Sequence, residues 1–356
     1  MTYRVGIIGT GRPWRSEGAT GMGMANFHAM GYQASPDVEI YAVCDIVPEN
    51  VQAFAERYGA EKVYVDYREM LSQEKLDIVS ICTWPALHAP MVEAAARAGV
   101  KAIHCEKPMA DTFGAAKRME AICDEMGVQL TINHQRRFVD TYIKAKELLD
   151  AGRIGDLVRI EMEAPNLYDW GTHYVDSMFY YNNETPADWV IGQIDGRESS
   201  MVFQMPNEAQ ALSYIRFAND VYGLAITGYG ARMGTRLIGT EGQIQAPYTR
   251  EEPVRVWGKG DSEWQVIDVD AFVDGPNFPG DVEKAILDII DCLKTGRKSI
   301  LDAHNALRTS EVIFATYESS RRRGRVDLPL DIDDNPFVSM IEEGQIRFSL
   351  RERPRG

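Results

Sequence analysis

Three short clusters in the chain combine residue types that can carry chemistry. Gly9-Thr10-Gly11 follows an apolar run, and its missing side chains let the backbone approach a pyrophosphate at a helix N-terminus. In Glu106-Lys107-Pro108, the lysine can hold a hydroxyl group or polarise a carbonyl group. Asp169 lies four residues before His173, so on a helix its carboxylate can orient the imidazole as an acid–base pair. Together these clusters predict proton transfer beside a bound dinucleotide.

The glycine cluster is separated from the next helical segment by a long insert. After Arg12–Gly23, Ala25 takes the place of the third glycine in a G-x-G-x-x-G pattern. From Ala25 the gap to the acidic Asp45 is the usual ~20 residues. We therefore expect the insert to lengthen the phosphate loop without abolishing it. The alternative interpretation is that the glycines form only a tight turn and a helix cap.

Asp45 indicates which dinucleotide fits. A carboxylate at the end of the second apolar run can accept hydrogen bonds from both ribose hydroxyl groups. The same carboxylate repels a 2′-phosphate, and Ile46 and Val47 supply no cation to receive one. The sequence therefore predicts NAD as the cofactor and disfavours NADP.

The charged residues and histidines also have simpler interpretations. A lysine taken alone is usually a surface residue, so a functional role for Lys107 is inferred only in combination with the glycine loop. No second histidine or cysteine accompanies Asp169, His173 and Asp176, so no metal site is predicted there. Three further histidines are interpreted as structural groups: His28, His104 and His304.

The first 130 or so residues alternate short apolar runs with segments of helical length, which is typical of βαβ units and a parallel sheet. The expected strands are Val5–Ile8, Val38–Cys44, Val63–Val65, Leu76–Cys82, Val100–Cys105 and Val128–Ile132. The expected helices are Ala25–Ala34, Pro48–Tyr58, His88–Ala98 and Thr112–Met126. Gly59, Gly99 and Gly127 stand where C-cap glycines belong.

After residue 133 the hydrophobic pattern changes to one typical of strands with alternating apolar and polar residues. The expected elements are a helix at Phe138–Ala151, strands at Val158–Met162, Ala211–Phe217 and Val221–Ile226, a tight turn at Gly239–Gly242, and helices at Asp281–Leu293 and Ala303–Arg322. The predicted fold class is therefore an α/β Rossmann domain with a doubly wound parallel sheet, followed by an α+β domain with a mainly antiparallel, open sheet. The expected boundaries are 1–135 and 136–330, with a surface arm at 331–356.

Composition excludes several classes of protein. Lys and Arg total 38 against 53 Asp and Glu, and the net charge of −15 disfavours binding to nucleic acid or to an anionic membrane. The basic run Arg321–Arg325 is interpreted as a solvated helix end. Five cysteines without a C-x-x-C pair indicate free, buried thiols, which favour the cytoplasm. No signal peptide or membrane span is predicted.

Read together, the clusters resemble the glucose–fructose oxidoreductase, inositol dehydrogenase and rhizopine-catabolism (Gfo/Idh/MocA) family of nicotinamide-dependent sugar and polyol oxidoreductases. The resemblance covers nearly the whole chain. The motifs that carry it are Gly9-Thr10-Gly11, Ala42-Val43-Cys44-Asp45, Thr83 with His88, Glu106-Lys107-Pro108, Gly152-Arg153-Ile154-Gly155, Asp169-x-x-x-His173, and Gly324-Arg325-Val326-Asp327-Leu328-Pro329.

The resemblance implies a role for each matching residue. Lys107, Asp169 and His173 match the family's catalytic lysine, aspartate and histidine. The implied dinucleotide contacts are Gly9, Gly11, Asp45, Thr83, His88 and Glu106, with Thr10 and Ala25 completing the loop. Two features depart from the family pattern: the Arg12–Gly23 insert, and Trp84 where many members have proline. Two interpretations of Trp84 stay open: a ring that stacks on a sugar or on the nicotinamide, and the simpler one, a core aromatic residue.

The expected function is an NAD-dependent enzyme that transfers hydride between a secondary hydroxyl of a sugar, polyol or glycoside and the nicotinamide. The first alternative is a redox-neutral enzyme that oxidises and re-reduces one sugar to achieve glycoside cleavage or epimerisation. The second is a catalytically silent dinucleotide-binding sensor, against which the intact Lys107, Asp169 and His173 argue. The resemblance also implies a homodimer or homotetramer.

Overall fold

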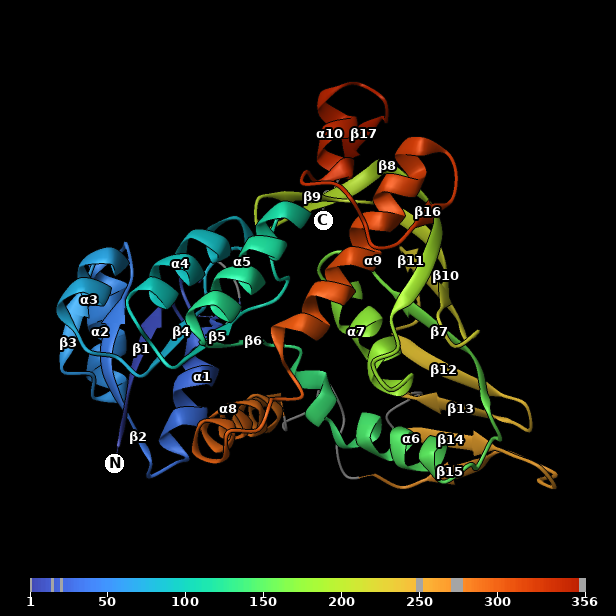
Figure 1. Cartoon of the computed structure of the whole chain (residues 1–356), viewed down its shortest axis with the longest axis horizontal. Helices are drawn as coiled ribbons and strands as arrows, with labels where there is room; N and C mark the ends of the chain where they lie inside the picture. The colour runs from blue at the N-terminus through green and yellow to red at the C-terminus, as the bar shows by residue number, and fades with distance from the viewer. Residues whose placement is uncertain (1, 14–15, 20–21, 248–251, 270–277, 352–356) are drawn as a thin grey trace. The chain divides into compact units, whose positions relative to one another are not determined.

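The computed structural model describes residues 2–13, 16–19, 22–247, 252–269 and 278–351. The chain divides into two compact units. The first contains residues 1–110, 115–135 and 277–304, and the second contains residues 111–114, 136–276 and 305–356. Figure 1 colours the chain from its N-terminus in blue to its C-terminus in red.

The first unit is built on a parallel sheet whose strand order is β3-β2-β1-β4-β5-β6. This order is the classical doubly wound one, and it confirms the predicted Rossmann fold. The strands are β1 Tyr3–Ile8, β2 Val38–Cys44, β3 Lys62–Tyr64, β4 Ile78–Ile81, β5 Ala102–Cys105 and β6 Gln129–Ile132. The helices are α1 Met24–Gln33, α2 Pro48–Tyr58, α3 Tyr67–Gln73, α4 Pro85–Arg97, α5 Phe113–Met126 and α8 Phe278–Thr295.

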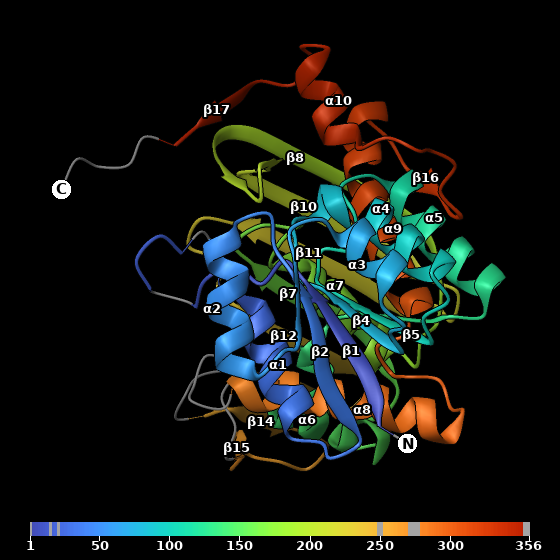
Figure 2. The ribbon, with the colours of Figure 1, turned by 90° about the vertical axis from the view of Figure 1, so that its left-hand side faces the viewer.

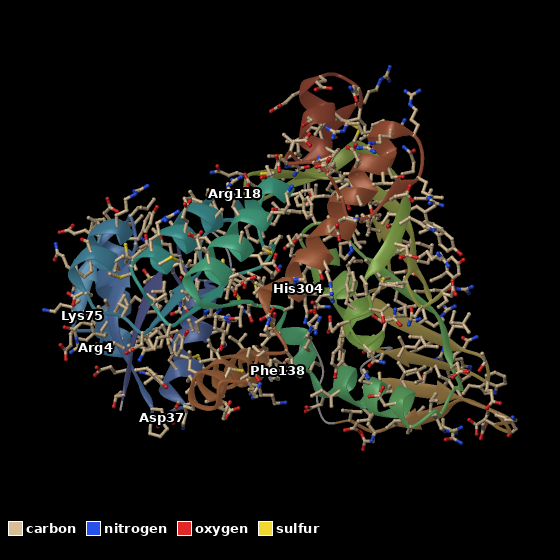
Figure 3. The ribbon with its side chains drawn as sticks, viewed as in Figure 1. Arg4, Asp37, Lys75, Arg118, Phe138 and His304 are labelled. Carbon is tan, nitrogen blue, oxygen red and sulfur yellow. The ribbon has the colours of Figure 1, made fainter. Side chains whose placement is uncertain are left out.

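Helices cover both faces of this sheet, as its continuous apolar strands require. Figure 1 shows α4 and α5 on one side of the strands and α1 and α8 on the other. Helix α8 packs closely on α1, because a Cβ atom on Gly31 would lie 2.9 Å from the Ile286 side chain. An ion pair of 2.6 Å joins Lys294 Nζ in the last turn of α8 to Asp37, which is labelled in Figure 3.

The second unit is built on a mixed, mainly antiparallel sheet of order β15-β14-β13-β12-β7-β11-β10-β8-β16, which confirms the predicted class. Within this path, β7 and β11 run parallel. The strands are β7 Leu157–Ala164, β8 Ala187–Val202, β9 Met205–Asn207, β10 Gln210–Phe217, β11 Tyr222–Gly228, β12 Gly234–Gly239, β13 Gln243–Ala246, β14 Val254–Trp257, β15 Gln265–Ile267, β16 Val326–Asp327 and β17 Phe348–Leu350. The helical segments are η1 Gln135–Phe138, α6 Asp140–Asp150, α7 Gly171–Tyr181, α9 Ala303–Arg322 and α10 Pro336–Glu342.

One face of this second sheet is covered and the other is open. Side chains of α7 and α9 share a hydrophobic core with the covered face, while Ile191, Leu212 and Ile226 on the other face are 44–49% exposed. In Figure 1, α6, α7 and α9 lie on the covered side. The alternation of buried and exposed residues along β10 follows from the two-residue period of a strand with one wet face.

The structure differs from the sequence expectations at several elements. Helix α3 and the 16-residue strand β8 were not expected. The segment after residue 331 does not stay a surface arm, because α10 buries Phe337 and Met340 in the second core, and β17 pairs with β8. Figure 2 shows β8 as a long curved ribbon with β17 beyond α10. Residues 277–304 belong to the first unit, whereas the sequence placed them in the second domain.

Candidate functional site

The glycine loop at the end of β1 leaves room for a ligand at its second glycine. Gly9 has a φ of +85°, and a Cβ atom there would lie 2.7 Å from Thr83 Cγ2, so only glycine fits. Gly11 has a φ of +54°, and a Cβ atom there would meet no other atom within 4 Å. A side chain at Gly11 would therefore fill open space that a phosphate group can occupy.

The N-terminus of α1 completes the cradle. Gly23 precedes the helix with a φ of 65° and no side-chain cap, and the first turn contains no acidic residue. Unpaired N–H groups at such an end attract anions. Ala25 is fully buried, as expected for the close packing position of the third glycine. These residues fit a dinucleotide pyrophosphate.

Asp45 joins the glycine loop to the end of β2. Its Oδ2 accepts hydrogen bonds from the backbone N–H of Gly11 at 2.8 Å and from the hydroxyl of Thr10 at 3.3 Å. Its Oδ1 accepts the N–H of Val47 at 2.9 Å. The carboxylate is half-buried, and its oxygens retain lone pairs for further donors such as ribose hydroxyls.

Part of the insert is held against α2. Arg12 donates from Nε to Asn50 Oδ1 at 2.9 Å and from Nη1 to the carbonyl oxygen of Glu17 at 2.8 Å. Gly18 lies against the same guanidinium with a φ of +73°. Arg15, the other cation of the insert, lies outside the described residues.

His88 connects the loops that follow β4 and β5. Its Nε2 lies 3.1 Å from the carbonyl oxygen of Thr83, and its Nδ1 lies 3.1 Å from those of Pro108 and Met109. Burial lowers the pKa of His88, and these carbonyl oxygens oppose that effect. The ring is fully buried and contacts backbone carbonyl groups of both loops, so His88 holds the two loops together. A direct contact between His88 and a dinucleotide stays a prediction. Trp84 is 37% exposed, so the interpretation as a core aromatic residue was wrong.

Glu106 and Lys107 follow the last residue of β5. The Glu106 carboxylate is buried, with Oε1 2.9 Å from His28 Nε2 and 2.7 Å from Asn133 Nδ2. Its Oε2 accepts the backbone N–H of Lys107 at 3.2 Å. The Lys107 side chain is half-buried at the carboxyl edge of the sheet, where open α/β sheets bind their ligands. The geometry thus turns Glu106 inward, and its predicted contact with the dinucleotide remains untested.

The second unit carries the other two predicted catalytic residues. Asp169 is 8% exposed and His173 is 4% exposed, and they lie on either side of the start of α7. Asn166 closes the turn before this helix, because its Oδ1 accepts the N–H groups of Asp169 and Trp170 at 2.9 Å each. The spacing predicted a helix across the pair, and Asp169 instead occupies the turn before it.

A buried glutamate fixes the same turn. Glu208 accepts hydrogen bonds from the backbone N–H of Leu167, from the Tyr317 hydroxyl at 2.7 Å and from the Thr227 hydroxyl at 3.1 Å. Burial raises the pKa of Glu208, and these donors offset the effect in part. Sequence reasoning missed Asn166 and Glu208; the signal for Asn166 was an asparagine, whose side chain commonly bonds the backbone of a turn.

Asp176 is engaged by a cation within the second unit. Its carboxylate receives Arg137 Nε at 2.7 Å and Nη2 at 2.9 Å, and both side chains are 3% exposed. A carboxylate held by a bidentate arginine has little capacity left for a metal ion. In the described ranges, no group of three or more His, Cys, Asp or Glu side chains is placed to hold a metal.

All five cysteines are free, as predicted, and four of them are buried. None of the helices in the described part of the chain has an apolar stretch long enough to cross a membrane.

Comparison with known families agrees with this geometry. Residues 3–134 match the family model described as an oxidoreductase family with an NAD-binding Rossmann fold, and residues 146–328 match that family's C-terminal alpha/beta domain. The chain therefore belongs to the Gfo/Idh/MocA family of oxidoreductases.

Relatives within this family include named sugar and polyol dehydrogenases. The D-apiose dehydrogenase of Paraburkholderia graminis is 24% identical, over 90% of this chain and 91% of the relative. The inositol 2-dehydrogenase of Salmonella typhimurium is 26% identical, over 76% of this chain and 83% of the relative. A solved structure of levoglucosan dehydrogenase with NADH shares the fold at a TM-score of 0.78 and 21% identity, covering 92% of this chain and all of that one.

Proposed function

We propose that the chain is an NAD-dependent dehydrogenase that oxidises a secondary hydroxyl of a sugar, polyol or glycoside. The observation that carries this proposal is the pairing, within one unit, of an open phosphate cradle at Gly11 with Lys107 at the carboxyl edge of the same sheet. Membership of an NAD-binding oxidoreductase family supports the same conclusion.

The preference for NAD over NADP rests on Asp45. Its carboxylate is tied to the loop by Gly11 and Val47, so it cannot turn away from a bound ribose without losing two hydrogen bonds. Hydroxyl groups at the 2′ and 3′ positions donate to such a carboxylate, whereas a 2′-phosphate is repelled by it. The neighbouring Ile46 and Val47 carry no compensating charge.

The proposed chemistry divides the work among three side chains. NAD, when bound, supplies the hydride acceptor. His173 accepts the hydroxyl proton of the substrate at a ring nitrogen, and Asp169 orients that ring. The Lys107 ammonium stabilises the negative charge that develops on the substrate oxygen. In the family, these three positions match the catalytic residues, and that match supports the assignment.

The substrate we propose is neutral. A net charge of −15 disfavours long-range attraction of anionic substrates. The names of the relatives, which include apiose, inositol and levoglucosan dehydrogenases, point to the same chemical class.

The test measures NADH absorbance with purified protein, NAD⁺ or NADP⁺, and a panel of inositols, free sugars and glycosides. We expect absorbance to rise with NAD⁺ and one class of polyol or sugar. Mass analysis of the products tests the redox-neutral alternative, which predicts cleaved or epimerised sugar without net NADH. Binding of NAD⁺ with no change in any compound would instead support the sensor.

We further propose that the open sheet face joins two or more copies of the chain. Apolar residues face each other across the strands: Leu212 pairs with Ile226, and Tyr214 pairs with both Ile191 and Leu224. An exposed apolar patch of this kind is typical of a protein–protein interface. The free cysteines also support the cytoplasm as the site of action.

A further inference from the structure

A buried polar cluster within the first unit has no part in the chemistry proposed above. It joins His28 on α1, Ser80 on β4, Glu106 after β5 and Asn133 after β6, and Tyr32 lies beside it. His28, Ser80 and Asn133 are fully buried, and Glu106 is 5% exposed. A carboxylate in such surroundings is costly unless it is fully hydrogen-bonded, so the arrangement needs an explanation.

The contacts of His28 form a chain that ends at the Lys107 backbone. His28 Nδ1 lies 3.1 Å from Ser80 Oγ, which in turn lies 2.8 Å from the Tyr32 hydroxyl. On the other side of the ring, Nε2 lies 2.9 Å from Glu106 Oε1. The second oxygen of Glu106 accepts the backbone N–H of Lys107. His28 therefore contacts the residue that directly precedes the proposed catalytic lysine.

The charge state of Glu106 reinforces this connection. Burial acts to raise the pKa of Glu106, but the hydrogen bond and charge of His28, the hydrogen bond of Asn133 and the charge of Lys107 outweigh it and lower the pKa to about 2. The carboxylate is therefore ionised at neutral pH, and it acts electrostatically on Lys107 as well as through the backbone. Moving Glu106 away from His28 would leave a buried charge short of a partner.

The position of His28 ties this cluster to the dinucleotide cradle. His28 lies one turn into α1, whose N-terminus directly follows Gly23 at the end of the insert. The same short helix thus begins at the proposed pyrophosphate site and ends its first turn against Glu106.

We propose that His28 is a positioning residue that acts through Glu106 to hold Lys107 in place and to link it to the N-terminal turn of α1. This proposal rests on the proposed function, in which Lys107 contacts the substrate. It differs from a structural role for His28, because it requires a change at Lys107 itself when the contact with Glu106 is lost.

The test compares His28→Gln and Glu106→Gln with His304→Gln. His304 pairs with Glu120 at 2.6 Å, so it is a histidine–glutamate pair that does not include Glu106. We expect His28→Gln and Glu106→Gln to lower kcat at least about tenfold, and the NADH Kd of His28→Gln to stay within about threefold of the native value. His304→Gln should leave both quantities near their native values.

A second measurement reports on Lys107 without turnover. Trace acylation of the lysine amines at one fixed pH, quantified by mass spectrometry, gives the relative reactivity of Lys107 in each variant. His28→Gln and Glu106→Gln should change this reactivity, because the backbone N–H of Lys107 loses its fixed acceptor or that acceptor loses its support. The reactivity of Lys101, whose ammonium pairs with Asp77 at 2.8 Å, should not change and serves as the internal control.

The outcomes separate this proposal from the proposed function. Unchanged kcat in His28→Gln together with unchanged Lys107 reactivity in both variants would overturn the positioning role. If Lys107→Met keeps full turnover, the catalytic assignment fails, while the acylation of Lys107 in His28→Gln and Glu106→Gln still decides whether the two residues act on it. If His28→Gln does not fold, Glu106→Gln carries the test, because it keeps the shape of the side chain.

Discussion

His173 and Asp45 carry the sharpest predictions at the scale of single residues. His173→Ala should lower kcat by ~10²–10⁴-fold, because the substrate hydroxyl would lose its proton acceptor. The Kd for NADH should stay within about threefold, since the dinucleotide cradle lies on other residues. Steady-state kinetics and NADH fluorescence titration measure the two quantities.

The control for His173 is His304→Ala. His304 is an exposed histidine at the start of α9 that contacts Glu120 at 2.6 Å, and Figure 3 labels it. Its removal should leave kcat unchanged. Native turnover in His173→Ala would remove that residue from the mechanism.

Asp45→Ser should weaken the use of NAD and relax the discrimination against NADP. We expect kcat/KM with NAD⁺ to fall about tenfold or more, since the ribose loses a charged acceptor, and the ratio of NAD⁺ to NADP⁺ efficiency to fall further because repulsion is removed. Glu49→Gln, which neutralises an exposed carboxylate in the first turn of α2, is the control for general charge effects. A cofactor ratio that shifts equally in both variants would argue against a local role for Asp45.

At the scale of elements, two buried glutamates of opposite pKa direction support the two sets of proposed site residues. Glu106, whose pKa is lowered to about 2, stands next to Lys107, while Glu208, whose pKa is raised, holds the turn before α7. The difference has a physical source: Glu106 contacts His28 and Asn133, whereas the donors to Glu208 are two hydroxyl groups and backbone N–H groups. The charge of Lys107 adds to these contacts and also favours the ionised form of Glu106.

Glu208 therefore makes stability depend on pH in a defined direction. The pKa of Glu208 in the folded state lies above its unfolded value of about 4.3, so the native state binds the proton more tightly. The contribution of Glu208 to the free energy of unfolding therefore falls as pH rises from the unfolded pKa through the folded pKa. Glu208→Gln should gain stability relative to the native chain as pH rises from about 4 to about 7. Denaturant unfolding followed by tryptophan fluorescence measures the difference.

An exposed glutamate in the same unit provides the comparison for this pH effect. Glu342→Gln at the end of α10 should shift stability by a small amount that does not grow with pH in this way. A stability difference for Glu208→Gln that is constant with pH would show that the carboxyl group titrates alike in both states.

The elements that the sequence predicted well are those whose own residues carry the signal. The strands of the first sheet coincide with short apolar runs, of which β4 and β5 are fully buried, and helix α9 has the predicted bounds Ala303–Arg322. Helix α3 was missed although Asp66 caps it and Glu69 stands three residues later, which is the capping-box pattern. Strand β8 was missed because Gly192, Gly196 and several charged residues interrupt its apolar alternation, and its pairing with β10 supplies the order that local propensity lacks.

The site shows the same limit. Motif spacing identifies the glycine loop, Asp45, Lys107, Asp169 and His173 in the sequence. It does not identify the residues that hold them in place. Asn133 is 105 residues from His28 and 27 residues from Glu106 along the chain, and Glu208 is 41 residues from Leu167. Contacts of this range depend on how strands are ordered in the sheet, which one sequence does not state.

At the scale of the whole molecule, the sequence did not predict which unit each segment joins, again because that choice depends on contacts between distant residues. Helix α8 is strongly amphipathic, so the sequence identified it as a helix, but either unit offers an apolar surface for it. Its buried residues Val282, Ile286 and Ile289 join the core of the first unit with α1 and α2. The chain therefore returns to the first unit before α9 carries it back to the second.

The open face of the second sheet is the basis for predicting the oligomeric state of the chain. On β8, β10 and β11 it carries the exposed apolar residues Ile191, Leu212 and Ile226, and the next strand, β7, has Arg159, Glu161 and Glu163 beside them. A patch bounded in this way buries most of its apolar area when a second copy covers it, and stable interfaces bury ~1,200–2,000 Å² in total. We therefore expect the native chain to sediment as a dimer or tetramer.

Placing charges on this patch should separate the copies. In the double variant Leu212→Lys with Ile226→Lys, two paired side chains that are 49% and 44% exposed become cations, which cost little in the monomer but are strongly unfavourable when desolvated at an interface. Analytical ultracentrifugation should show a loss of at least half the native mass. Val266→Lys, 49% exposed on β15 of the same sheet, is the matched control and should keep the native mass. A native chain that sediments as a monomer, or a double variant that keeps the native mass, would place the interface elsewhere or remove it.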